Sequence, residues 1–108
     1  MRENLVDMIS RVASAAEKEY CAVIGKEYEE WQDEFIRQKV HYFLGHPDLR
    51  ASEAHDEWVA QKIREGWRYS DVPSDFSSPM ITEYDNLPIE RRRSDYLFLG
   101  ICRALVFG

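Results

Sequence analysis

The sequence predicts an all-α fold of about four helices, with one long ordered loop between the third helix and the fourth. Apolar residues recur at three- and four-residue steps in four segments, as they do along one face of an α-helix. Each of the first three segments ends at a glycine, a residue typical of helix ends: Gly25, Gly45 and Gly66. No segment alternates convincingly with the two-residue period of a strand.

The first two helices are expected over residues 4–24 and 29–44. The apolar side chains of the second helix fall into two groups at about 3.6 residues per turn. One group is Trp31, Phe35 and Tyr42, and the other is Ile36, Val40, Phe43 and Leu44. A helix with two apolar faces is either central to the fold or shared with a partner. We expect the central position.

The third helix is expected to begin at Ser52, a good N-cap residue, and to end at Gly66. A loop of about twenty residues with three prolines follows, and loops of that length in compact domains are often functional. Pro88 suits the first turn of a last helix. The expected buried stripe of that helix is Leu97, Phe98, Ile101, Cys102 and Leu105.

Composition restricts the class of partner. The 108 residues include 14 Lys and Arg against 20 Asp and Glu, a net charge of −6, which argues against a general nucleic-acid binder. No run approaches the ~18 apolar residues of a membrane span, and the N-terminus lacks an apolar signal core, so a cytoplasmic location is expected. Cys21 and Cys102 lie in apolar helical contexts, which favours buried free thiols over a disulfide.

The third helix carries an unusual face. His55, Val59 and Lys62 lie on one side of it, with Trp58 beside them. Such a face either lines a pocket, where indole stacks on a planar ring and ammonium meets a phosphate, or is ordinary packing. In the second case Lys62 lays its stem over Trp58 and His55 is a satisfied, half-buried histidine. Trp67 and Tyr69 follow at alternate positions, and with Tyr84 they either extend the same wall or pack under the loop.

No catalytic residues, metal ligands or cofactor are predicted. No motif pairs a nucleophile with a base, and the cysteines lie on core faces. His41, His46 and His55 lack metal-ligand spacing. The cluster "RRRS", residues 91–94, is read as a solvated helix face rather than a phosphorylation site or an anion-binding patch.

Three stretches resemble the ryanodine-receptor repeat (RyR) domain family: "HDEWVAQKIREGWRYS", "SPMITEYDNLP" and "RRSDY". The matching positions are His55, Trp58, Lys62, Gly66, Trp67, Tyr69, Pro79, Tyr84, Asp85, Leu87, Pro88 and Asp95. The first and last helices also resemble small stand-alone RyR-domain proteins of bacteria and phages. The chain departs from the family at Ser70 and Glu83, where glycine and proline are usual, and its "PSDFSS" loop carries none of the usual lysines.

The length fits one domain over residues 1–108, and the resemblance places the signature region in 51–108, after a helical pair in 1–50. It implies a non-enzymatic module that binds an adenine or cyclic nucleotide through His55, Trp58, Lys62, Trp67, Tyr69 and Tyr84. It further suggests a phage or bacterial protein that senses or sequesters a defence signal. Because the family's repeats occur in tandem pairs, a homodimer is expected through Trp31, Phe35 and Tyr42. The alternative is a protein-interaction module without a small ligand.

Overall fold

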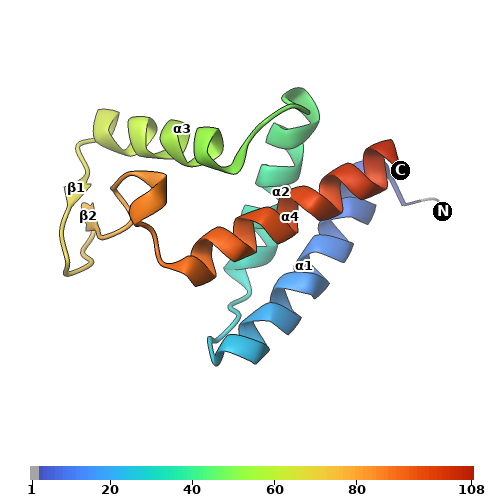
Figure 1. The fold of residues 1–108 in the computed structure, drawn as a ribbon, viewed down its shortest axis with the longest axis horizontal. Coiled ribbons are helices and arrows are strands. Elements are labelled where there is room, and N and C mark those ends of the chain that lie inside the picture. The colour runs from blue at the N-terminus through green and yellow to red at the C-terminus, as the bar shows by residue number, and fades with distance from the viewer. Residues whose placement is uncertain (1–2) are drawn as a thin grey trace. The chain divides into compact units, whose positions relative to one another are not determined.

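A computed structural model describes residues 3–108 and confirms the predominantly α-helical fold with four helices (Figure 1). The helices are α1 (Leu5–Ile24), α2 (Trp31–Gly45), α3 (Ala51–Arg64) and α4 (Ile89–Phe107). Between α3 and α4 lie two short strands, β1 (Arg68–Tyr69) and β2 (Ser77–Ser78), and the 3₁₀ helix η1 (Tyr84–Asn86). Within the described residues, no helix is both long and apolar enough to cross a membrane.

The chain divides into two compact units. The first unit contains the described residues up to Asp48 together with Arg93–Gly108, and the second contains Leu49–Arg92. The first boundary lies next to the expected division after residue 50. Residues 93–108 fall in the same unit as the N-terminal helices. The sequence motifs had placed these residues in the signature region.

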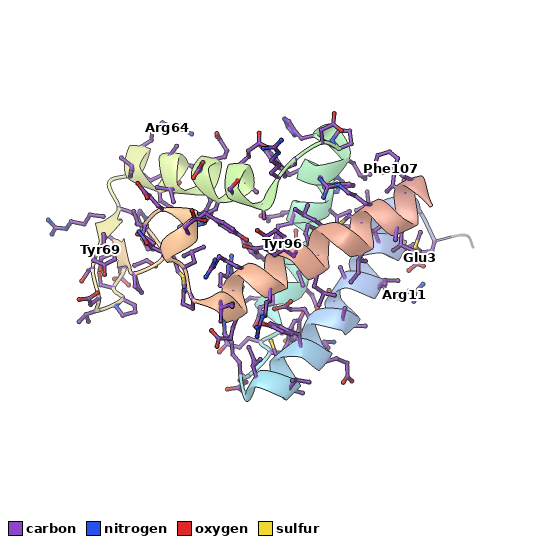
Figure 2. The ribbon with its side chains drawn as sticks, in the orientation of Figure 1. Glu3, Arg11, Arg64, Tyr69, Tyr96 and Phe107 are labelled. Atoms are coloured by element: carbon purple, nitrogen blue, oxygen red, sulfur yellow. The ribbon has the colours of Figure 1, made fainter. Side chains whose placement is uncertain are left out.

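Helix α1 has the termini that the sequence predicts. The Asn4 side chain accepts a hydrogen bond from the Asp7 backbone N–H at 2.8 Å, which satisfies one of the amides left unpaired at a helix start. Gly25 ends the helix at φ +72°, and the Lys26 N–H donates to the Cys21 carbonyl at 2.8 Å. Arg11 pairs with Glu3 at 3.0 Å near the start of α1 (Figure 2).

The core of the first unit forms where α1, α2 and α4 meet. Its fully buried side chains come from all three helices: Ile9, Cys21, Val40, Phe43 and Cys102. Ser94 of α4 donates to the Glu17 carboxylate of α1 at 2.7 Å, and the Lys39 ammonium of α2 lies 4.2 Å from the Phe98 ring centre. The predicted free, buried state of both cysteines is confirmed.

The buried face of α4 differs from the predicted one. Phe98 and Cys102 are buried as expected, but Leu99 is buried too, whereas Leu97 and Leu105 remain 38% and 37% exposed. Apolar residues cover more than half of this helix, so periodicity does not determine which of them the neighbouring helices cover. The contacts with α1 and α2 make that choice.

Helix α2 begins two residues later than predicted and is not enclosed on both faces. Ile36, Val40 and Phe43 are buried. On the other face Trp31 is 61% exposed and Tyr42 is 39% exposed, so the prediction of a central helix is wrong.

Helix α3 begins two residues earlier than predicted. Arg50, in extended conformation, takes the N-cap position assigned to Ser52, and its backbone N–H donates to the Glu53 carboxylate at 3.2 Å. Ser52 lies inside the helix. Glu53 accepts the Arg50 N–H from within the first turn, as the third-position acid of a capping box does, and this hydrogen bond favours a helix start at Arg50.

The loop after α3 is ordered, as expected, but contains strands that the sequence did not reveal. β1 and β2 pair in parallel, with Arg68 opposite Ser77 and Tyr69 opposite Ser78. Ser77 is buried, and its hydroxyl donates to the Val72 carbonyl at 3.1 Å and lies 2.6 Å from the Ser74 hydroxyl. Two-residue strands are too short to show an alternating pattern, which explains why sequence periodicity missed them.

Candidate functional site

The second unit holds all six predicted site residues, and α3 positions three of them on one face. His55, Trp58 and Lys62 are spaced by three and four residues, the spacing of neighbours on a helix surface. His55 is buried, whereas Trp58 and Lys62 are half-buried.

The end of α3 places a second indole over the same face. Gly66 has φ +90°, its N–H donates to the Ile63 carbonyl at 3.0 Å, and the Trp67 N–H donates to the Lys62 carbonyl at 2.9 Å. This is the Schellman arrangement, in which the second residue past the helix end folds back onto its last turn. An apolar contact between these two positions usually accompanies the Schellman motif. Here a cation–π contact between the Trp67 ring and the Lys62 ammonium takes its place.

The Lys62 ammonium lies next to two indole rings. Its Nζ is 4.7 Å from the ring centre of Trp67 and 5.9 Å from that of Trp58, and 3.9 Å from a Glu65 carboxylate oxygen. Cation–π contacts of this kind contribute roughly 0.5–2 kcal/mol each, depending on exposure. About a quarter of the lysine side chain (26%) remains exposed. We call Trp58, Lys62 and Trp67 the aromatic–lysine cluster.

His55 connects α3 to the long loop. Its Nε2 lies 2.7 Å from the Thr82 carbonyl oxygen, so Nε2 carries the proton and donates it. The ring stacks on Trp58 at 5.8 Å between ring centres with 25° between planes. The donating nitrogen is therefore already used within the protein, which agrees with the reading of His55 as a satisfied packing residue.

Tyr84 lies next to His55 and is also buried. It belongs to η1, its ring centre is 5.8 Å from that of His55, and its hydroxyl donates to the Arg92 carbonyl at 3.5 Å. His55 and Tyr84 thus support the aromatic–lysine cluster from within and present little surface to a ligand.

Tyr69 makes its hydrogen bond outside the cluster. It is 54% exposed at the end of β1, labelled in Figure 2, and its hydroxyl donates to the Asp71 carboxylate. That hydrogen bond, with the negative charge of Asp71, raises the pKa of the Tyr69 phenol above its ordinary value. The structure therefore groups Trp58, Lys62 and Trp67, adds His55 and Tyr84 beneath them, and leaves Tyr69 at the edge.

Phe76 lies next to Trp67, a contact that the sequence did not predict. Its ring meets Trp67 edge to face at 6.2 Å between centres, and it is 64% exposed. The pairing of β1 with β2 brings it there, because the Arg68 N–H donates to the Phe76 carbonyl at 3.1 Å. A stretch as short as "PSDFSS" gives no periodic signal that could have revealed this contact.

Groups suited to covalent or metal chemistry do not gather at this face. Among residues 3–108, no cluster of three or more His, Cys, Asp or Glu side chains has the geometry of a metal site. Burial raises the pKa of the Cys102 thiol to about 11 and also raises that of Cys21, where the nearby Glu17 carboxylate adds to the effect. Both shifts disfavour the reactive thiolate.

Comparison with known proteins adds no relative. No protein-family model, curated protein or solved structure matches the chain.

Proposed function

We propose that the chain is a non-enzymatic binding module that takes an adenine-containing or cyclic nucleotide at the aromatic–lysine cluster. One observation carries the proposal: the ammonium of the partly exposed Lys62 side chain lies beside two indole rings on one helix face. Indole rings stack on nucleobases, with about 1–3 kcal/mol per base, and an ammonium is a compact partner for a phosphate. The resemblance of the same residues to the RyR family points to the same ligand class.

Binding requires the lysine to change partners. In the free protein the Lys62 ammonium faces Trp67 and Glu65. A phosphate offers it a full negative charge, which is a stronger partner than an indole face. The long lysine stem allows that movement, and the indole face that it vacates becomes available to the base. His55 and Tyr84 then act as positioning residues, and Tyr69 contacts a ligand only at the rim.

Calorimetry with paired ligands tests this division of roles. Lys62→Met keeps the side-chain length and removes the charge, so we expect roughly tenfold weaker binding of adenosine monophosphate and little change for adenosine. Trp67→Ala removes the stacking surface and weakens both ligands.

Two variants serve as matched controls. Arg64→Gln removes an exposed cation of the same helix, and Trp31→Ala removes an exposed tryptophan of the other unit. Neither should change the binding. Absence of heat with every nucleotide, in protein shown to be folded by circular dichroism, contradicts the proposal.

A protein-interaction module is the second candidate, and one observation favours it. Four apolar side chains of the second unit are more than half exposed: Ile63, Tyr69, Val72 and Phe76. Such residues are typical of protein interfaces when they are contiguous. A double variant, Ile63→Ser with Val72→Ser, should abolish capture of a partner chain and leave nucleotide affinity unchanged. The reverse result favours the nucleotide.

The biological role that we propose is sensing or sequestration of a signal nucleotide in bacterial or phage defence, in the cytoplasm. It rests on the resemblance to stand-alone RyR-domain proteins. Sequestration predicts that the nucleotide is recovered chemically intact after the protein is denatured. Recovery of a hydrolysis product indicates an enzyme instead.

We also propose self-association. Trp31, Phe35 and Tyr42 lie on the open face of α2, and Trp31 is the most exposed of the three tryptophans. A light-scattering mass that stays at 12.8 kDa as the concentration rises contradicts it.

A further inference from the structure

The open face of α2 is a continuous stripe. Positions 31, 35, 38 and 42 follow one another at three- and four-residue steps, so they lie on one side of the helix. Trp31, Gln38 and Tyr42 are exposed and Phe35 is half-buried. The buried residues Ile36, Val40 and Phe43 occupy the opposite side. The stripe is therefore available for contact with another molecule.

Charges are separated along the same helix. Acids cluster at its N-terminal end and in the residues just before it: Glu29, Glu30, Asp33 and Glu34. Arg37, just before the middle, is paired with Asp7 of α1, and the C-terminal half with the cap carries Lys39, His41 and His46 and no acid. A second α2 laid parallel would bring acids against acids, whereas an antiparallel α2 brings acids against bases. The charge pattern therefore selects the antiparallel orientation.

We propose that two copies of this chain pair through α2, antiparallel, about a two-fold axis between Arg37 and Gln38. The inference rests on the self-association proposed above and specifies its geometry. In an interface with two-fold symmetry each contact occurs twice, so a residue before the axis meets one equally far behind it. Glu34 then faces His41 of the second copy, and His41 faces Glu34 of the second copy. Both are exposed and lie on the same flank of the stripe.

A second copy fits this surface because the surface is complementary to itself. The aromatic groups are distributed on both sides of Gln38, with Trp31 and Phe35 before it and Tyr42 after it. Antiparallel pairing therefore brings the tyrosine end of one helix to the tryptophan end of the other. Aromatic side chains of this size dominate interface energetics.

The area of the α2 face determines the expected affinity of the dimer. A helix of 15 residues is about 22 Å long, and one helix face per partner is at the small end of interface areas, below about 1,200 Å² in total. We therefore expect a weak dimer, with a dissociation constant in the micromolar range.

Charge reversal in single and mixed variants tests the arrangement. Glu34→Lys removes the carboxylate from both Glu34–His41 pairs, and His41→Glu sets two carboxylates against each other in both. Sedimentation velocity of each variant alone should give a dimer dissociation constant about tenfold higher than that of the wild type. An equimolar mixture of the two should recover a dimer containing one of each, because Lys then meets Glu and Glu meets His.

Two further proteins complete the experiment. Glu19→Lys, an equal charge change at an exposed position of α1, is the matched control and should leave the mass unchanged. Trp31→Ala should dissociate the dimer. A wild-type protein that is monomeric at every concentration overturns self-association itself. If neither Glu34→Lys nor His41→Glu changes the dimerisation affinity, only the antiparallel α2 geometry is overturned. The site is tested independently, since nucleotide binding concerns the other unit.

Discussion

Single side chains explain why polar groups lie on an otherwise apolar face of α3. His55 is buried but donates its proton to the Thr82 carbonyl across 27 residues of sequence, which satisfies both partners. Lys62 places its charge over indole rings instead of burying it unpaired. Each polar group is therefore accommodated by a partner that comes from the loop or from the chain just after the helix.

Removing the His55 contact should destabilise the loop. His55→Phe retains an aromatic ring against Trp58 but leaves the Thr82 carbonyl without its donor. We expect the free energy of unfolding to fall by about 1–3 kcal/mol. Urea denaturation measures it, with Gln61→Phe at an exposed position of the same helix as the control, expected to change stability by less than about 0.5 kcal/mol. Equal effects of both substitutions contradict a structural role for His55.

The buried thiol of Cys102 makes stability depend on alkaline pH. Burial raises its pKa from the ordinary 9.0 of a free thiol to about 11, so the unfolded chain releases this proton first as pH rises. The favourable contribution is fully present below pH 9.0 and is lost as pH rises towards 11. Cys102→Ala should therefore flatten the decline in melting temperature across that window, whatever it does to stability at neutral pH. A slope identical to that of the wild type contradicts this.

At the scale of elements, the C-terminal end of α3 decides where the Trp67 side chain lies. The helix ends at Gly66 in a left-handed conformation, and only that reversal brings the Trp67 ring back over Lys62. An ordinary residue at this position would pull the chain towards negative φ and move the indole away. The glycine thus links a local backbone preference to the geometry of the aromatic–lysine cluster.

Gly66→Ala tests this link. We expect a loss of about 1–2 kcal/mol in stability, because alanine is strained at φ +90°. The nucleotide affinity should fall with it. Gly100→Ala, inside α4 with open space around the added methyl group, should instead gain about 0.5–1 kcal/mol. Thermal unfolding of the two variants compares them directly, and a neutral result at Gly66 contradicts the argument.

At the scale of the whole molecule, the two proposed activities belong to different units. The aromatic–lysine cluster lies within Leu49–Arg92, and α2 lies in the unit that contains the N-terminal helices. Variants should therefore separate the activities. Glu34→Lys should weaken the dimer and leave the nucleotide affinity of the monomer unchanged, while Lys62→Met should do the reverse. Loss of both activities in either variant indicates that they share one surface.

The sequence by itself determined the all-α class, the ends of α1, the glycine at the end of α3 and the free thiols. These depend on periodicity and on residues whose conformational preferences are local. Only the tertiary structure decided that Leu99 replaces Leu97 in the core, that α2 keeps one aromatic face open, and that Phe76 lies against Trp67. Such choices depend on which segment covers which face. The two polar residues that the sequence places on an apolar helix face, His55 and Lys62, are explained only by partners supplied through folding.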